Sequence, residues 1–443
     1  MRRRLEIAFC LLLAVFCSWM SEPVQAAETS GPGLQQLIDN TPAGETLRLP
    51  AGTYQGAVTI TRPMTIQADG EVHIVNASGK PAVYVQAAQV RLQSLTITQE
   101  FENNPAVLVT GSSATLDGLD IRTRSFGIVL RDTADNEIRN SRVIWLEDES
   151  RDPVKLSEKL NGIDLYNAHR NRIQDNVVSG MHDGIYLESS HQNTVEHNRV
   201  DYSRYGVHCM YTDGTVIRAN TGSFNVTGAM IMGVKDAEVT GNSFYKQSES
   251  VNSQGLLLFD VQTSSIADNK VQGNRVGLYI EQSRRNELRN NEVIQNFVGI
   301  QLLESEENRF TGNRFSGNVI EAEATDSRDN RLEGNYWDSF RGIDTTGDGF
   351  SDLPYLMNPF FQKLTKATPA FQLFFQSPGM QFLESMNTAG KSEWTMDTAP
   401  LMRPEEAGGA ATEQSGQAGM LMLGIFLLLL SWTTIYFTGG KKT

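Results

Sequence analysis

Asn171-Arg-Ile-Gln-Asp-Asn176 and Asn193-Thr-Val-Glu-His-Asn198 are two copies of one pattern, in which two asparagines enclose a short strand-like run. Three further copies follow, and at three more places the closing asparagine recurs without the opening one, so that eight closing asparagines lie 22 residues apart with a single interval of 27. The series is Asn176, Asn198, Asn220, Asn242, Asn269, Asn291, Asn313 and Asn335. A second ladder shares this period and its interruption, namely Gly162, Gly184, Gly206, Gly228, Gly255, Gly277 and Gly299. Two independent markers with one period indicate a solenoid of repeated coils.

The residues between these markers have the character of short strands. They form brief alternating runs cut by Gly, Asn, Asp and Ser, without helical periodicity. A unit of 22 residues cannot bury its own apolar face, whereas coils stacked about 4.8 Å apart can. We therefore expect an all-β fold, a right-handed parallel β-helix of about a dozen coils, with the hand taken from the usual parallel crossover. Asparagine suits the corner because it tolerates left-handed turns and its amide can bond to the copies above and below.

The N-terminal end of the chain lies outside the repeat. Three arginines, Arg2 to Arg4, precede an apolar run, and small residues follow at Val24 and Ala26. This order is typical of a secretory signal peptide, which we assign to residues 1–26. The mature protein is then exported.

The C-terminal part of the chain also lacks the repeat. We assign residues 27–340 to the β-helix and residues 341–418 to a C-terminal segment and flexible linker, and we expect no clear core in residues 341–413. Residues 419–437 carry no charge and are followed by Lys441 and Lys442. This predicts a transmembrane helix with the lysines on the cytoplasmic side. The alternative is a helix that lies on the membrane or docks on a partner.

Charge and cysteine content exclude some classes of function. The chain has 443 residues and a net charge of −14 at pH 7. An acidic surface argues against nucleic-acid binding, which needs a basic stripe, and it attracts cations. Cys10 and Cys17 fall in the signal peptide, so Cys209 is alone in the mature chain and no internal disulfide framework is expected.

Alternation along the strands that the ladder glycines open predicts which side chains face outward. One and three residues after each glycine the side chains are apolar, so positions two and four face out. On two adjacent coils these positions hold His208, Met210, Met230 and Met232. Because neighbouring strands lie about 4.8 Å apart, His208 should lie beside Met230 and Met210 beside Met232. Soft thioethers with an imidazole suit Cu(I), and we predict a copper site here.

Other features bear on this predicted site. Met181 and His182 precede the neighbouring strand and could add to the ligands. Outward methionines beside Leu257 and Phe259 also form an apolar surface, which would suit a partner protein or burial under the tail. Alternation turns Cys209 inward, where we expect a structural, unreactive thiol.

Residues 344–352 resemble a calcium-binding loop in part. Asp344, Asp348 and Asp352 stand at positions 1, 5 and 9, with a glycine at position 6. Position 3 is threonine and position 12 is Tyr355 rather than glutamate. The pattern allows a Ca²⁺ site and, more simply, an ordinary Asp/Gly turn.

Between residues 30 and 385, roughly, the chain resembles the NosD family of proteins for nitrous oxide reductase maturation. The motifs that carry this resemblance are Lys159-Leu-Asn-Gly-Ile-Asp-Leu165, Tyr205-Gly-Val-His-Cys-Met-Tyr211, Asn335-Tyr-Trp-Asp338 and Asp348-Gly-Phe-Ser-Asp-Leu-Pro354. The resemblance implies a periplasmic protein, not an enzyme, that receives Cu(I) from a lipoprotein copper chaperone. It implies delivery to nitrous oxide reductase for the copper–sulfide cluster, together with an ABC transporter made of a membrane subunit and an ATPase. It also implies that the apolar clusters of residues 371–386 dock on the membrane subunit, whereas a C-terminal membrane span is not expected of the family.

A polysaccharide-binding or polysaccharide-modifying protein of the lyase or epimerase type is the competing hypothesis. Parallel β-helices often have such functions, and the chemistry needs paired carboxylates over a groove or a calcium site with a basic residue. The outward positions hold Asp164, Glu188 and Glu281, which we expect on non-adjacent coils without an acid–base pair.

Overall fold

A computed structural model gives the structure of the protein and describes residues 33–147, 150, 152–247, 253–374, 377–387 and 394–404. The predicted signal peptide and the predicted membrane span lie outside these residues. Within the described ranges, no helix is both long and apolar enough to cross a membrane.

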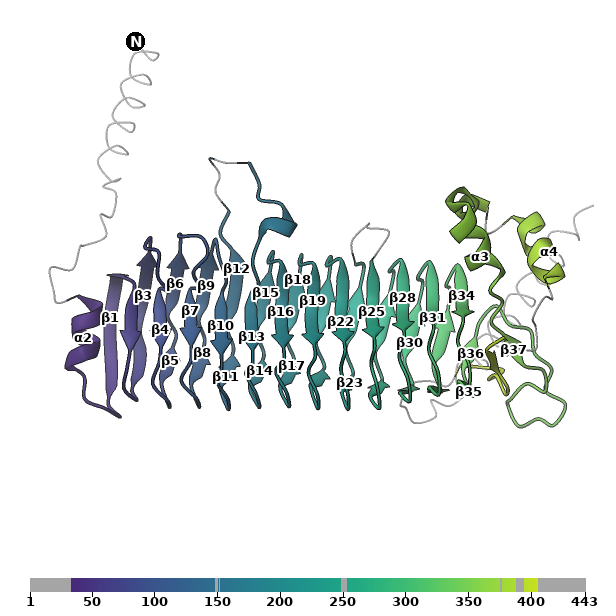
Figure 1. The fold of residues 1–443 in the computed structure, drawn as a ribbon, viewed down its shortest axis with the longest axis horizontal. Coiled ribbons are helices and arrows are strands. Elements are labelled where there is room, and N and C mark those ends of the chain that lie inside the picture. Colours follow the sequence, from purple (N-terminus) through teal and green to yellow (C-terminus); the bar gives the residue numbers. More distant parts are fainter. Residues whose placement is uncertain are drawn as a thin grey trace, which may run out of the picture. The chain divides into compact units, whose positions relative to one another are not determined.

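The coils stack as predicted, and each contributes strands to three parallel faces (Figure 1). The first face, here called the site face, is a sheet of twelve strands within the described residues. In order, they are β2 (Val58–Ile60), β4 (Val83–Val85), β7 (Val107–Val109), β10 (Ile128–Arg131), β13 (Ile163–Tyr166), β16 (Asp183–Glu188), β19 (Tyr205–Met210), β22 (Thr227–Met232), β25 (Gln254–Phe259), β28 (Val276–Glu281), β31 (Val298–Leu303) and β34 (Ile320–Thr325).

The other two faces branch from the long strands β1 (Thr46–Gln55) and β3 (Thr65–Asn76). One continues through β5 (Arg91–Gln93), β8 (Thr115–Asp117), β11 (Glu137–Arg139), β14 (Arg172–Gln174), β17 (Thr194–Glu196), β20 (Val216–Arg218), β23 (Glu238–Thr240), β26 (Ser265–Ala267), β29 (Glu287–Arg289), β32 (Arg309–Thr311) and β35 (Arg331–Glu333). The other continues through β6 (Thr96–Gln99), β9 (Asp120–Thr123), β12 (Arg142–Trp145), β15 (Val177–Ser179), β18 (Arg199–Asp201), β21 (Thr221–Ser223), β24 (Ser243–Tyr245), β27 (Lys270–Gln272), β30 (Glu292–Ile294), β33 (Arg314–Ser316) and β36 (Tyr336–Trp337).

The core lies inside the coils and follows the predicted alternation. The residues one and three positions after each ladder glycine are buried, from Ile163 and Leu165 to Ile300 and Leu302. Each buries its apolar side chain against the copies in the coils above and below, which no single coil could achieve.

Asparagine ladders run inside the corners. The side-chain amide of Asn176 donates to Oδ1 of Asn198 (2.9 Å), and the same oxygen accepts the backbone N–H of Asn176 (3.0 Å). The expected stacking is confirmed, but the expected left-handed asparagine is not. The left-handed residue is the one before it, such as Asp175 (φ 55°) or His197 (φ 55°).

The ladder glycines are needed for close approach between coils. A Cβ atom added at Gly184 would lie 2.7 Å from the carbonyl oxygen of Gly206 in the next coil. Because that neighbour is backbone, a side chain at this position would push the coils apart. The glycines therefore set the tight packing of the site face.

Both ends of the stack are closed by other elements (Figure 1). The N-terminal end is capped by the helix α2 (Leu34–Asn40), which buries Leu34 and Ile38. At the other end follow β37 (Tyr355–Leu356), α3 (Phe360–Ala367), η2 (Pro369–Phe374), α4 (Pro378–Met386) and β38 (Met396–Asp397). Between β12 and β13, a longer connection contains the short helix η1 (Leu156–Glu158).

The segment after the last coil has more structure than its sequence predicts. Strand β38 pairs with β35, and Oδ2 of Asp397 accepts the side-chain amide of Asn335 (2.9 Å), which extends the asparagine ladder by one step. Met357 is buried against the solenoid core, and Phe361 and Met380 form a small cluster of their own. The expectation of no clear core beyond residue 341 is therefore wrong for these residues.

Candidate functional site

Strands β19 and β22 carry the predicted copper ligands in the predicted register. His208 pairs with Met230 and Met210 pairs with Met232 across the two strands. The three methionines are half-buried on the outer side of the site face. The structure thus brings these four side chains to one place.

His208 is not the exposed residue that the alternation suggested, because only 6% of its surface is accessible. Its ring has edge-on contacts with Tyr186, at 5.0 Å between centroids, and with Tyr205, at 4.7 Å. Alternation turns the side chain outward, but the two tyrosines then cover it. His208 is therefore enclosed by neighbouring side chains rather than exposed on an open surface.

A buried carboxylate holds one nitrogen of this ring. Nδ1 of His208 lies 2.9 Å from Oδ2 of Asp183, which in turn accepts two hydrogen bonds from Arg204 at 2.7 and 2.8 Å. Although burial alone would raise the pKa of Asp183, the bonds from His208 and Arg204 hold it below its usual value. Asp183 is therefore a carboxylate that can only accept, so Nδ1 carries the proton.

In the neutral imidazole, the other ring nitrogen of His208 keeps its lone pair. Nε2 of His208 is buried and has no hydrogen-bond partner among the described residues. Buried polar atoms are nearly always paired, so an orphaned one calls for an explanation. A soft metal ion beside the thioethers of Met210 and Met230 would supply the missing partner.

Met181 and His182, the two residues before β16, lie in different surroundings. Met181 is fully buried in the solenoid core, so the structure does not bring its thioether to the site face. His182 is half-buried and lines a pocket beside His208. Burial lowers the pKa of His182, which leaves its imidazole neutral near pH 7.

This pocket has a volume of about 550 Å³ and opens beside the predicted ligands. Its twelve lining residues are Phe126, Arg131, Asn161, Asp164, Tyr166, His182, Asp183, Tyr186, Glu188, Arg204, His208 and Met210. Its size lies within the range of small-molecule sites, and it gathers several groups with displaced pKa values, which is typical of functional sites.

Carboxylates of adjacent coils meet in this pocket. Asp164 lies on β13 and Glu188 on the neighbouring β16, so the expectation that they stand on non-adjacent coils is wrong. Burial raises the pKa of Asp164, even though Arg131 lies 2.6 Å away. Burial and a hydrogen bond to Glu188 likewise raise the pKa of Tyr186.

The sequence did not reveal the partners of His208. Asp183 lies one residue before the ladder glycine Gly184 and Arg204 two residues before Gly206, so neither is at one of the alternating positions that follow each glycine. Strand pairing places residue 183 beside residue 205 in the adjacent coil, three residues before His208, and alternation extended to residue 183 would turn its carboxylate inward. The contact with His208 therefore left no signal in the sequence pattern.

Cys209 faces the interior, as predicted. It is fully buried, and burial raises the pKa of its thiol to about 12. The thiol is therefore protonated near neutral pH and is a poor metal ligand or nucleophile.

The acidic loop of residues 344–352 binds its own backbone. Asp344 accepts the amides of Gly347 (2.6 Å) and Gly349 (3.0 Å), and Asp352 accepts the amide of Thr345 (2.8 Å). An Asp/Gly turn satisfies its N–H groups in this way. In the parts of the chain that the structure describes, no cluster of His, Cys, Asp and Glu could hold a metal ion. Calcium binding stays a prediction.

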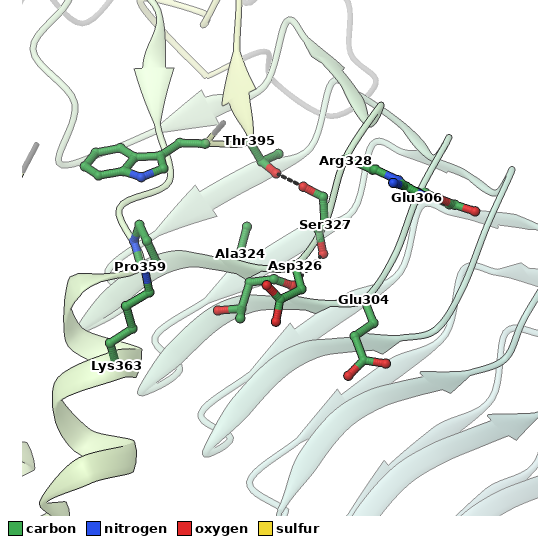
Figure 2. Close-up of a pocket in the computed structure, with 11 residues that line it drawn as sticks. Glu304, Glu306, Ala324, Asp326, Ser327, Arg328, Pro359, Lys363 and Thr395 are labelled. Carbon is green, nitrogen blue, oxygen red and sulfur yellow. Dashed lines mark hydrogen bonds and ion pairs between the residues drawn. The ribbon is translucent and has the colours of Figure 1, made fainter. Parts of the chain in front are cut away.

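A second pocket, of about 620 Å³, lies where α3 meets the last coils. Figure 2 shows Glu304 and Asp326 at the ends of the site-face strands, with Pro359 and Lys363 of the C-terminal segment opposite them. Thr395 donates to the carbonyl oxygen of Ser327 across this junction (3.4 Å). The pocket is polar, exposed and partly occupied by its own ion pair between Arg328 and Glu306 (3.1 Å), so it is a weaker candidate site.

Two protein families match the sequence. Residues 148–342 match the model of a family described as periplasmic copper-binding protein (NosD), and residues 68–222 match the right-handed beta helix region. The resemblance to the NosD family is confirmed. The predicted right-handed parallel β-helix is confirmed as well, and the NosD match spans the coils that carry His208 and the methionines. A search of curated protein sequences found no match.

The solved structures to which this chain is similar include a lyase and a module of an epimerase. The alginate lyase AlyF-OU02, in complex with G6, is 14% identical with a TM-score of 0.52, over 68% of this chain and 83% of the lyase. The A-module of mannuronan C-5 epimerase AlgE6 from Azotobacter vinelandii is 13% identical with a TM-score of 0.49, over 66% of this chain and 90% of the module. At such low identity, the similarity to the lyase is evidence for the fold alone.

Proposed function

We propose that this protein is a periplasmic copper-handling component rather than an enzyme. It receives Cu(I) from a copper chaperone and passes it, together with an ABC transporter, to nitrous oxide reductase during assembly of the copper–sulfide cluster. The predicted C-terminal helix would hold it at the inner membrane. Copper is the cargo in this scheme.

One observation carries the proposal. Within the span of the NosD match, Met210 and Met230 lie beside His208, whose Nε2 is buried without a hydrogen-bond partner in the described part of the chain. Thioethers are soft ligands that select Cu(I), and imidazole also suits copper. The adjoining pocket gives a second protein a route to the copper.

Copper affinity tests the proposal. The purified protein is loaded with Cu(I) without oxygen, and its affinity is measured by competition with a chromophoric chelator. We expect His208→Ala and Met210→Ala to weaken binding at least about tenfold. Met210→Leu should do the same, because it keeps the apolar volume and removes only the thioether. His191→Ala, at an exposed corner, is the matched control, and unchanged affinity in all three site variants would contradict the proposal.

A polysaccharide-modifying function is a second candidate, and the pocket beside His208 is the observation that favours it. Tyr186 and His182 could move protons there, while Arg131 and Arg204 lie close enough to bind an anionic substrate. Both arginines are already paired with carboxylates, which weakens this candidate. Incubation with uronate polymers distinguishes the two: new unsaturated sugar ends or inverted C-5 centres, lost in Tyr186→Phe, would favour the enzyme.

A further inference from the structure

Asp183 at the start of β16, Arg204 just before β19 and His208 within β19 form a chain of hydrogen bonds. Nε of Arg204 donates to Oδ1 of Asp183 (2.8 Å), and Nη2 donates to Oδ2 (2.7 Å). Nδ1 of His208 lies 2.9 Å from the same Oδ2. The side chain of Asp183 is 1% exposed, and both of its oxygens are engaged. The carboxylate is therefore fixed in position and in orientation.

This chain decides which nitrogen of His208 carries the proton. A carboxylate paired with a guanidinium has no proton to donate, so the neutral imidazole must donate from Nδ1. The proton cannot then be on Nε2, which faces away from Asp183 across the ring. Histidines that bind metals usually donate their second ring N–H to such a carboxylate, because this fixes the tautomer and raises the basicity of the ligand nitrogen.

The rest of the surroundings hold the ring in place. Tyr186 and Tyr205 contact it edge-on, and Arg204 lies over the ring of Tyr205 at 4.4 Å. The same arginine therefore orients Asp183 and supports one of the tyrosines. The ring has little freedom to turn over and exchange its two nitrogens.

We propose that Asp183 is the positioning residue of the copper site. Supported by Arg204, it holds His208 in the tautomer whose Nε2 binds Cu(I) beside the thioethers of Met210 and Met230. Asp183 itself does not touch the copper. This assignment rests on the proposed function, since it describes how that site is prepared for its ion.

The tautomer can be measured in the wild-type protein without copper. With ¹⁵N-labelled histidine, long-range proton–nitrogen correlations distinguish a protonated from an unprotonated ring nitrogen, and loss of one signal set in His208→Gln assigns the residue. We expect a protonated Nδ1 and an unprotonated Nε2. A proton on Nε2 would overturn the assignment, whatever the variants of Asp183 do.

Copper affinity then tests the role of the carboxylate. Asp183→Asn keeps the size of the side chain but replaces one accepting oxygen with an NH₂ group, so it cannot accept all the hydrogen bonds from Arg204 and His208. We expect Cu(I) binding to be weaker by about 10- to 100-fold. We also expect a mixture of the two tautomers at His208. Asp183→Glu restores the charge and should recover part of the affinity. Asp213→Asn is the matched control, because Asp213 lies 3.9 Å from His191 at an exposed corner and should leave both readings unchanged.

The possible outcomes separate this assignment from the proposed function. If the wild type does not bind Cu(I), the proposed function fails, and the positioning role fails with it even if Nδ1 is protonated. If the wild type binds copper and a folded Asp183→Asn variant binds it equally well, only the positioning role fails. Weaker binding with an unchanged tautomer also overturns it, since Asp183 would then act by other means. If Asp183→Asn does not fold, Asp183→Glu and the wild-type tautomer decide.

Discussion

Neighbouring coils of this protein use histidine in two different ways. At an exposed corner, His169 and His191 stack with their ring centroids 5.3 Å apart. Nδ1 of His169 accepts the backbone amide of His191 (3.1 Å), and Nδ1 of His191 accepts that of Asp213 (3.0 Å). On the site face, Nδ1 of His208 instead donates to Asp183 (2.9 Å).

The difference lies in which nitrogen keeps its lone pair. A backbone amide can only donate, so neutral His169 and His191 must carry their proton on Nε2. They act as the ladder asparagines do, by accepting an N–H from the next coil. His208 carries its proton on Nδ1, and of these three residues it is the one whose Nε2 is prepared to bind a metal. Grouping imidazoles is therefore not sufficient to make a metal site. The hydrogen-bond partner of each ring nitrogen determines which nitrogen keeps its lone pair for a metal.

The carboxylates beside the two groups should differ most in their effect on stability. We expect Asp183→Ala to lower the free energy of unfolding by about 3 kcal/mol, because it leaves Arg204 and His208 without their buried partner. Asp213→Ala should change it by less than about 0.5 kcal/mol, since exposed ion pairs contribute little. Denaturant unfolding measures both, and equal losses would show that the two environments are alike.

Met181 and Met210 should likewise differ in their effect on the Cu(I) affinity. We expect Met181→Leu to cost about 1 kcal/mol or less, because it exchanges one buried apolar side chain for another of similar volume. It should leave the Cu(I) affinity unchanged, in contrast to Met210→Leu. Chelator competition and thermal unfolding give the two readings, and weaker copper binding in Met181→Leu would place its thioether among the ligands after all.

The stacked histidines should make the corner sensitive to acid. Burial, followed by the charges of His191 and Arg170, lowers the pKa of His169 below its ordinary value. The unfolded chain then takes up the proton at a higher pH than the folded chain. The contribution of neutral His169 to the free energy of unfolding is therefore complete above about pH 6.5 and is lost as the pH falls through the folded pKa.

Asparagine in place of His169 tests this effect. His169→Asn keeps an acceptor for the amide but does not titrate, so it should remove about 0.5 kcal/mol of the loss between pH 7.5 and pH 5. The difference in unfolding free energy between the two pH values is the measurement, with Asp213→Asn as control. An acid response that is the same in His169→Asn and the wild type would locate the effect elsewhere.

Cys209, between two outward residues, should show the smallest effect of all. Because the thiol is buried with a pKa of about 12, we expect negligible alkylation of the native protein and full alkylation after unfolding. Cys209→Ala should leave the Cu(I) affinity unchanged. Rapid labelling of the folded protein would mean that this strand faces the other way.

The repeat in the sequence was sufficient to predict the solenoid, the inward and outward positions and the pairing of β19 with β22. The reason is that a 22-residue period leaves one register in which all apolar positions face inward. Alternation also predicted the inward Cys209 correctly, without any knowledge of its neighbours.

The surroundings of the site could not be predicted in the same way. Alternation says that His208 leaves the core, but not that Tyr186 and Tyr205 then cover it. Met181 precedes its strand, where the chain is turning and the period of two does not hold, so its inward direction was not predictable. Asp183 and Arg204 bond through side-chain geometry, which no periodic pattern contains.

The constant height of the coils has a consequence for distance. Coils stack at a step of about 4.8 Å, and the chain between β22 and β34 is divided into units that share one register. Removing residues 277–298 would join Val276 to Gly299 and restore the same ladders one step shorter. The solenoid therefore works as a ruler, because the distance from the methionine-bearing strands to the C-terminal helices is a whole number of coils. Evolution or design can lengthen this distance only by adding whole coils.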